Sequence, residues 1–274
     1  MTARRAVVRL RDGAVTRVSD ALAVEEPMEL RVDGRPLTVT MRTPGSDFDL
    51  AAGFLVSEGV VHSADQISAI RYCAGVDAEG RNTYNVVDVT LSPGTPAPAP
   101  GLQRSFATTS ACGVCGKTSL DEVHAATRYA VADDPVRIAP STLATLPERL
   151  RTAQRVFDRT GGLHAAGLFT ADGRLLAADE DVGRHNAVDK VVGASLLAGR
   201  LPEAGRVLMV SGRASFELVQ KALMAGIPIL AAVSAPSSLA VDLAERNGMT
   251  LVGFLRGSSC NVYAGAERIA DARA

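Results

Sequence analysis

Residues 207–254 read VLMVSGRASFELVQKALMAGIPILAAVSAPSSLAVDLAERNGMTLVGF, and this stretch decides the fold class. Its apolar runs suit short buried strands: Val207–Val210, Ile227–Val233 and Thr250–Phe254. Between them lie two segments with helical periodicity, Ser215–Ala225 and Ser238–Arg246. Strands joined through helices of this length form right-handed crossovers in a parallel arrangement. The stretch therefore predicts an α/β domain whose mixed sheet contains parallel strands.

The residues before this stretch extend the same domain. Ser141 is a candidate N-cap for a helix that Gly161-Gly162 closes, and its apolar stripe is Leu143, Leu146, Leu150, Val156 and Phe157. Asp172-Gly173 is a strong hairpin signal between His164–Phe169 and Arg174–Ala178. A helix is expected over about Asn186–Ala198. From Pro140 onward the predicted order is α-β-β-α-β-α-β-α-β.

The first half of the chain predicts a smaller α+β domain. Alternating apolar residues flank Asp33-Gly34 and predict a hairpin, and a strand is expected from about Tyr84 to Leu91. A helix should begin at Asp47, with Ser46 as its N-cap, and end at Gly59. The proline-rich segment Ser92–Gly101 predicts a linker or long loop. We place the N-terminal domain, with this linker and a cysteine loop at about 102–118, at residues 1–137, and the C-terminal domain at residues 138–274.

Bulk composition excludes some functions. The chain has 274 residues and a formal net charge of -1, which argues against non-specific nucleic-acid binding. Met1 to Asp20 lacks the apolar core of a signal peptide, and no apolar run reaches the ~18–20 residues of a membrane span. We therefore expect a cytoplasmic protein with no membrane partner. A chain of this size does not need disulfides for stability, and that compartment would keep its four cysteines reduced.

The most informative short motif is CGVCGK, residues 112–117. Glycines beside and between Cys112 and Cys115 leave both thiols sterically open. Lys117 and the start of a following helix, expected from Ser119 towards Tyr129, would favour the reactive thiolate. The alternative of two small core residues suits this Gly- and Ser/Thr-rich setting poorly.

Three other interpretations of the motif are weaker. Structural zinc needs further ligands, but Cys73, Cys260 and His124 stand alone in sequence, so we expect no permanent metal. A thioredoxin-like motif should follow a buried strand, and Arg104–Ser110 is a poor strand. A Walker A loop would need glycine at Ala111 and a preceding buried strand.

The loops after the predicted parallel strands suggest a second site. They read Ser211-Gly212-Arg213, Ser234-Ala235-Pro236-Ser237 and Arg256-Gly257-Ser258-Ser259. In a parallel sheet these ends share one edge, and two of them lead into helix N-termini that attract anions. Serine, glycine and arginine are typical phosphate ligands. The pattern predicts a nucleotide or pyrophosphate pocket in which Arg213 and Arg256 clamp phosphate.

A third cluster, Glu180-Asp181-Val182-Gly183-Arg184-His185-Asn186, continues to Asp189-Lys190. Such a cluster is typical of a solvated ion-pair face, or it supplies acid, base and positioning groups with His185 as proton carrier. The spacing leaves both readings open.

The motifs together resemble the FdhD family of formate dehydrogenase accessory sulfurtransferases, in order and over nearly the whole chain. The resemblance is carried by CGVCGK and by these stretches: TPGSDFDLAAGFLVSEG (43–59), GGLHAAG (161–167), EDVGRHNAVDK (180–190), SGRASFELVQKA (211–222) and AVSAPSSLAVDLAERNGMTLVGF (232–254). It implies a sulfur relay. A cysteine desulfurase would load Cys112, with Cys115 as its partner, as a persulfide. The sulfur would then pass to the bis-molybdopterin guanine dinucleotide form of the molybdenum cofactor, a bound substrate destined for formate dehydrogenase.

The resemblance also implies site residues and a fold. The cofactor-binding stretch maps to Phe254, Leu255, Arg256, Gly257, Ser258 and Ser259, and the strand-end residues Ser211, Arg213 and Ser234 would complete the pocket for the guanine nucleotide moiety. The C-terminal domain would resemble cytidine deaminase, and the protein would be a homodimer.

Two departures bear on these expectations. RGSSCNVY, residues 256–263, differs from the family's pattern around Cys260, which puts the contacts of that loop in doubt. Deaminase chemistry is missing, because His164 has no Glu two residues later and Ala111 replaces a proline before the cysteine pair. The rival function is a chaperone that binds the cofactor while its cysteines are only structural.

Overall fold

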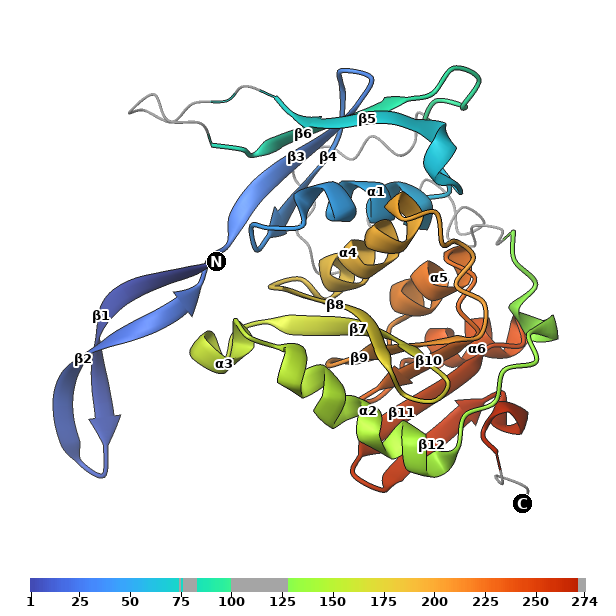
Figure 1. Cartoon of the computed structure of the whole chain (residues 1–274). Coiled ribbons are helices and arrows are strands. Elements are labelled where there is room, and N and C mark those ends of the chain that lie inside the picture. The colour runs from blue at the N-terminus through green and yellow to red at the C-terminus, as the bar shows by residue number, and fades with distance from the viewer. Residues whose placement is uncertain (74, 76–82, 100–127, 271–274) are drawn as a thin grey trace.

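The computed structural model describes residues 1–73, 75, 83–99 and 128–270 (Figure 1). Within these ranges the strands form a six-stranded sheet, a four-stranded sheet and a two-stranded hairpin. The cysteine loop, including Cys112 and Cys115, and the helix expected from Ser119 lie outside the described residues.

The six-stranded sheet is the centre of the C-terminal part, with strand order β12-β11-β10-β9-β7-β8. Its strands are β7 (His164–Thr170), β8 (Leu175–Asp181), β9 (Arg206–Val210), β10 (Ile229–Ala232), β11 (Thr250–Arg256) and β12 (Ser259–Ala264). Strands β9, β10 and β11 are parallel, with Ile229 opposite both Val207 and Thr250. This confirms the sheet with parallel strands and the hairpin at Asp172-Gly173.

Helices cover both faces of this sheet because apolar side chains alternate along its buried strands. Val207, Ile229 and Val252 pack in a core with α2 (Pro140–Ala153). Leu208, Leu230 and Leu251 point the other way. They belong to the core of α4 (Arg184–Leu197), α5 (Phe216–Met224) and α6 (Ser238–Arg246).

Two predicted helix starts need correction. Helix α2 begins at Pro140 with Ala139 as N-cap, so Ser141 lies inside the helix, because proline at the first position already has helical φ. It ends at Ala153, so Phe157 belongs to the short α3 (Phe157–Thr160). Ser46 does precede α1 (Asp47–Ser57), but it is left-handed, with φ 54°, and its side chain makes no capping bond.

The four-stranded sheet has the order β4-β3-β6-β5. Its strands are β3 (Glu26–Val32), β4 (Arg35–Arg42), β5 (Ile67–Tyr72) and β6 (Val86–Leu91). The hairpin at Asp33-Gly34 is confirmed by left-handed φ at both turn residues. Short 3-10 helices complete the elements: η1 (Ala64–Gln66), η4 (Val131–Asp133) and η5 (Ala266–Arg268). Residues 92–99 carry no helix or strand, as the prolines predict.

Helix α1 connects the two sheets. It lies under the four-stranded sheet and packs on α4 (Figure 1). The contact is so close that a Cβ on Gly53 would overlap the carbonyl of Asp189, and a Cβ on Gly193 would overlap that of Asp49. One apolar core therefore runs from the four-stranded sheet through α1 and α4 to the six-stranded sheet.

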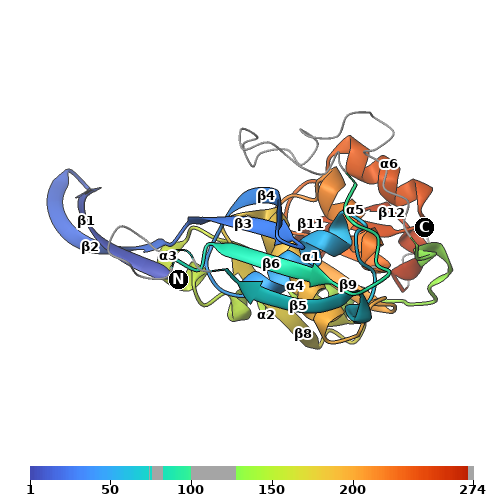
Figure 2. The same cartoon turned by 90° about the horizontal axis from the view of Figure 1, so that it is seen from above.

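The first residues form a separate feature that the sequence pattern does not predict. Strands β1 (Thr2–Arg11) and β2 (Ala14–Ala23) make an antiparallel hairpin that projects from the body (Figures 1 and 2). Among the described residues, no helix is both long and apolar enough to cross a membrane.

Candidate functional site at the carboxyl ends of the central strands

The loops that follow β9 and β10 lie side by side, as the sequence predicts. Ala214 N donates to Ala235 O at 3.2 Å, and Ser237 N donates to Ala214 O at 3.0 Å. Ser234 O accepts from Phe254 N at 3.1 Å. The backbone therefore holds all three predicted segments together along one edge of the sheet.

The third segment differs from the prediction in shape. Strand β11 continues to Arg256 and turns at Gly257 into β12, which was not predicted, with Arg256 opposite Ser259. Residues 254–259 therefore form a β-hairpin between β11 and β12 that extends beyond the ends of the parallel strands. The sequence had predicted a strand-end loop at this position. The Arg256 Nε donates to Val233 O at 3.3 Å, so this guanidinium lies over the end of β10.

Side chains of the predicted pocket differ in how accessible they are. Arg213 and Ser258 are exposed, and the Phe254 ring is 40% exposed on a backbone with φ 51°, a rare conformation for a non-glycine residue. Leu255 is buried in the core against α2, so only its backbone can face a ligand. The Ser211 hydroxyl accepts from Ala165 N at 2.9 Å and thereby fixes the loop to β7.

Three helices, α4, α5 and α6, begin at this edge. Ser237 Oγ accepts from Ala240 N at 3.3 Å and caps α6. Ser215 precedes α5 without a capping bond from its side chain, and Gly183 precedes α4 without one. The first amides of α4 and α5 therefore keep the partial positive charge that attracts anions.

The charged cluster at 180–190 is largely buried, so it is not a solvated face. Asp181 is 0% exposed and accepts from Lys190 Nζ at 2.9 Å, Gly183 N at 2.8 Å and Thr43 N at 3.1 Å. Lys190, 1% exposed, also donates to Thr43 O at 3.0 Å. These groups join the start of α4 to the segment before α1.

Arg184 and His185 remain at the strand edge, where His164 joins them. His185 Nε2 lies 2.6 Å from Glu217 Oε2 and 3.4 Å from Ser215 Oγ. A Cβ on Gly212 would lie 3.4 Å from the His164 ring and 3.9 Å from Arg184 Cδ, which places both side chains beside the β9 loop. Within the described chain the buried Arg184 Nε has no hydrogen-bond partner.

Burial lowers the pKa of His164 below its ordinary value, and the positive neighbours Arg184 and His185 lower it further. His164 is therefore held in its neutral form, and the edge owes its cationic and hydrogen-bond-donating character to Arg184, Arg213 and the first amides of α4 and α5, which suit a phosphate or another anion.

His164 and Glu217 were not predicted as site residues. His164 opens a strand antiparallel to β9, so its first residue falls at the edge where β9 ends. The hairpin signal Asp172-Gly173 already predicts that the chain reverses after β7. That reversal could have indicated that His164, the first residue of β7, lies near the ends of the parallel strands.

The two cysteines in the described ranges are half-buried. Cys260 packs against the core that contains α2, and this burial raises the pKa of its thiol above the ordinary value. A raised pKa disfavours the nucleophilic thiolate.

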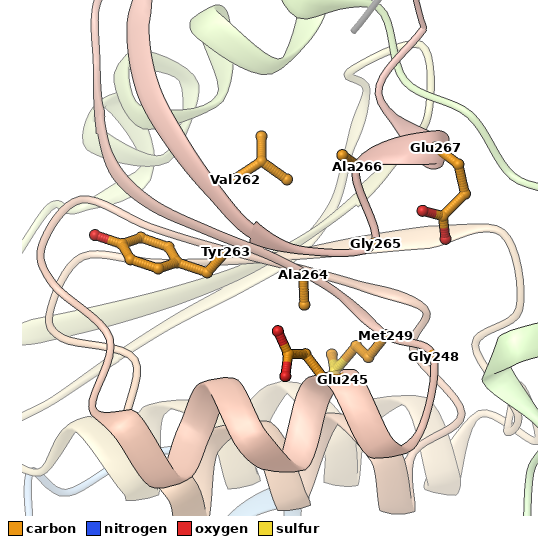
Figure 3. Close-up of a pocket in the computed structure, with 9 residues that line it drawn as sticks. All are labelled: Glu245, Gly248, Met249, Val262, Tyr263, Ala264, Gly265, Ala266 and Glu267. Carbon is orange, nitrogen blue, oxygen red and sulfur yellow. The ribbon is translucent and has the colours of Figure 1, made fainter. Parts of the chain in front are cut away.

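A cavity of about 400 Å³ lies elsewhere, between α6 and β12 (Figure 3). Its lining includes Glu245, Met249, Tyr263 and Glu267. Met249 directly precedes β11, so the cavity is at the amino end of that strand, opposite the candidate site.

The helix-covered sheet and the loops at the ends of its strands define this as a mixed α/β protein. Its candidate site suits an anion and lies where the parallel strands lead into the following helices. Residues 23–270 match the model of the FdhD/NarQ family, and the chain belongs to that family. A protein named "Sulfur carrier protein FdhD" from Streptomyces avermitilis is 64% identical over 271 residues, covering 98% of this chain and 96% of that protein. The protein of the same name from Mycobacterium tuberculosis is 57% identical over 271 residues, covering 98% of each.

A solved structure supports the fold. The crystal structure of a putative formate dehydrogenase accessory protein from Desulfotalea psychrophila superposes with a TM-score of 0.75. The two chains are 26% identical, and the match covers 98% of this chain and 99% of the other.

Proposed function

We propose that this protein is a sulfur carrier that serves a formate dehydrogenase. The observation that carries the proposal is family membership over residues 23–270, together with a relative named as a sulfur carrier that is 64% identical. The CGVCGK motif at residues 112–117 supplies two cysteines flanked by glycine for this chemistry.

The sulfur is carried as a persulfide on Cys112. The Cys112 thiolate attacks the outer sulfur of a cysteine desulfurase persulfide, a new S–S bond forms, and the donor's S–S bond breaks to release its thiolate. Cys115 shares or resolves the persulfide. The burial of Cys260 supports this choice of thiols, because a raised pKa makes Cys260 a poor nucleophile.

The acceptor is the molybdenum cofactor with its guanine dinucleotides, bound as a substrate at the strand edge. Arg213, Arg256 and the first amides of α5 hold the pyrophosphate, and Ser211 and Ser234 shape the loops around it. Phe254 supports this assignment, because its backbone N donates to Ser234 O and its exposed side chain offers an aromatic surface on which a purine can stack.

The relay is tested by incubating the protein with a cysteine desulfurase and cysteine. A gain of about 32 Da, the mass of one sulfur atom, is expected by intact-mass analysis, and reductant should remove it. Cys112→Ala should lose most of the adduct, while Cys73→Ala, the matched control, should keep it. Sulfur mapped to Cys73 or Cys260 would place the relay elsewhere.

The nucleotide site has its own test. Arg213→Ala should weaken binding of guanine nucleotides by about 1.5–3 kcal/mol, the range for a hydrogen bond to a charged group. Unchanged affinity by calorimetry, or equal affinity for adenine nucleotides, contradicts the assignment.

The chaperone alternative makes a different prediction. A Cys112→Ala protein that binds guanine nucleotide normally and still activates the dehydrogenase would favour a cofactor chaperone with structural cysteines. The cytoplasmic location, the homodimer and the division at residue 137 stay predictions.

A further inference from the structure

The β1–β2 hairpin, residues 1–23, is an arm that projects from the body (Figure 1). Ten residue pairs form its ladder, from Thr2–Ala23 at the base to Arg11–Ala14 at the tip. Contacts with the body lie near the base, where Val24 N donates to Met1 O at 3.0 Å and β2 passes α3. The family model begins only at residue 23, so the family assignment does not account for the arm.

The base of the arm lies next to the candidate site. Three residues separate the end of α3 from His164, which stands at the edge where β9 ends. One of the three is Gly162, and a Cβ placed on it would lie 3.8 Å from the Cβ of Ala23. A ten-residue strand then carries the tip about 34 Å away from this base. Only a macromolecule is large enough to contact both the tip and the strand edge.

The tip of the arm exposes apolar side chains on one face. Leu10 lies opposite Val15, and Val8 lies opposite Arg17, so all four share a face. Val8, Leu10 and Val15 are 58%, 76% and 65% exposed. We call Val8, Leu10, Val15 and Arg17 the tip patch. A two-stranded hairpin alone is only marginally stable in water, so an exposed apolar face on one indicates a surface that another molecule covers.

Charge indicates the chemistry of that molecule. Residues 1–23 hold five arginines and two aspartates, a net +3, and all five arginines are exposed. The rest of the chain holds 24 basic and 28 acidic residues, a net -4. An acidic protein is therefore attracted to the arm and repelled by the body, so the arm determines the orientation in which such a protein approaches.

The size of the tip patch indicates a transient contact. Stable interfaces bury about 800 Å² on each partner, formed by roughly 20–30 residues a side. A patch of three aliphatic side chains and one arginine is far smaller, so it suits a partner that binds, exchanges its cargo and leaves. The recipient of the bound cofactor is such a partner, because delivery has to occur at the strand edge beside the base of the arm.

We propose that the tip patch docks on an acidic surface with an apolar centre on the formate dehydrogenase apoprotein that receives the cofactor. Val8, Leu10 and Val15 contact its apolar centre, and Arg17 pairs with a carboxylate at the rim. The inference rests on the proposed function, since it takes the strand edge as the place from which the cofactor is delivered.

Binding of the cofactor-free dehydrogenase to the full chain, measured by biolayer interferometry, tests the apolar contact. The wild type should bind, and Leu10→Asp should raise the dissociation constant at least tenfold. Leu197→Asp is the matched control, because Leu197 is an exposed leucine at the carboxyl end of α4, away from the strand edge. This control should bind like the wild type, and circular dichroism should show the same fold for all three proteins.

A pair of arginine variants tests which face of the arm docks. Arg9 lies opposite Thr16 and therefore on the face away from the tip patch. Arg17→Glu and Arg9→Glu change the net charge equally, so both should slow association to a similar extent. Only Arg17→Glu should also speed dissociation, by at least about fivefold, because only Arg17 belongs to the docked face. Equal dissociation rates for the two variants contradict the assignment of the face.

Two further assays separate this inference from the proposed function. Leu10→Asp should still gain one sulfur atom from the desulfurase and bind guanine nucleotides like the wild type, because the arm takes part in neither step. A wild type that fails both assays overturns the proposed function, whatever the arm does. A wild type that passes them but does not bind the dehydrogenase, or binds it regardless of Leu10→Asp, overturns the docking proposal. So does binding through Leu10 to the desulfurase, to anionic vesicles or to a second copy of the chain in place of the dehydrogenase.

Discussion

At the scale of single residues, the ion pair between Asp181 and Lys190 has a clear structural role. Both groups are almost fully buried, and five further hydrogen bonds satisfy them. A buried charge without its partner costs about 3–5 kcal/mol, far more than a surface pair contributes.

Lys190→Met should therefore lower the free energy of unfolding by about 3–5 kcal/mol, measured by urea denaturation, because it leaves the Asp181 carboxylate uncompensated. Arg151→Met is the control, since its pair with Asp158 is exposed, with side chains 42% and 54% accessible. A loss below about 1 kcal/mol at Lys190, as expected for the control, would show that the pair contributes little.

His164 makes stability depend on pH. Burial lowers the pKa of its imidazole in the folded state, so between that pKa and the ordinary value of about 6.5 the unfolded chain binds more protons. Stability should be full above about pH 6.5 and should fall as the pH drops towards the folded pKa. His164→Asn should reduce this slope in melting temperatures from pH 5 to 7. An unchanged slope would assign the effect to other groups.

At the scale of elements, the contact of α1 with α4 depends on glycine. Gly193→Ala puts a methyl group where the Asp49 carbonyl lies, and backbone cannot yield as a side chain can. We expect a loss of at least about 2 kcal/mol in the free energy of unfolding, measured by urea denaturation. In Gly162→Ala, the control, the new methyl meets only ordinary contacts at 3.8 Å or more. A stable Gly193→Ala protein would mean that the helices can separate.

The elements that sequence predicts well are those with local signals. Asp33-Gly34 and Asp172-Gly173 mark real hairpins, and apolar runs mark β9, β10 and β11. Strand β12 is missed because the polar Arg256–Ser259 resembles a strand-end loop, while its pairing is made by backbone atoms. Those site residues that directly follow a strand in sequence, such as Ser211 and Ser234, can be predicted from the sequence. Glu217 cannot, because its role comes from a contact with His185 that only packing creates.

At the scale of the whole molecule, one apolar core includes Leu30 of the four-stranded sheet, Leu50 of α1, Val188 of α4 and Leu208 of the six-stranded sheet. Parts of a protein that share one apolar core are expected to unfold cooperatively. Both sheets should therefore show the same protection from hydrogen exchange at their central strands, measured by mass spectrometry. Faster exchange of β3 and β6 than of β9 and β10 would reveal independent unfolding.

The fit of Gly53 and Gly193 also limits how such chains can recombine. Helix α1 precedes the 92–99 linker in sequence and α4 follows it, so a crossover between two relatives at that linker inherits the two helix faces from different parents. In such a chimera α1 comes from one parent and α4 from the other. The two helices can pack as closely as they do here only if both parents have glycine at the positions of Gly53 and Gly193. Exposed linkers usually offer permissive breakpoints, but here the compatible unit is a helix pair split across the chain.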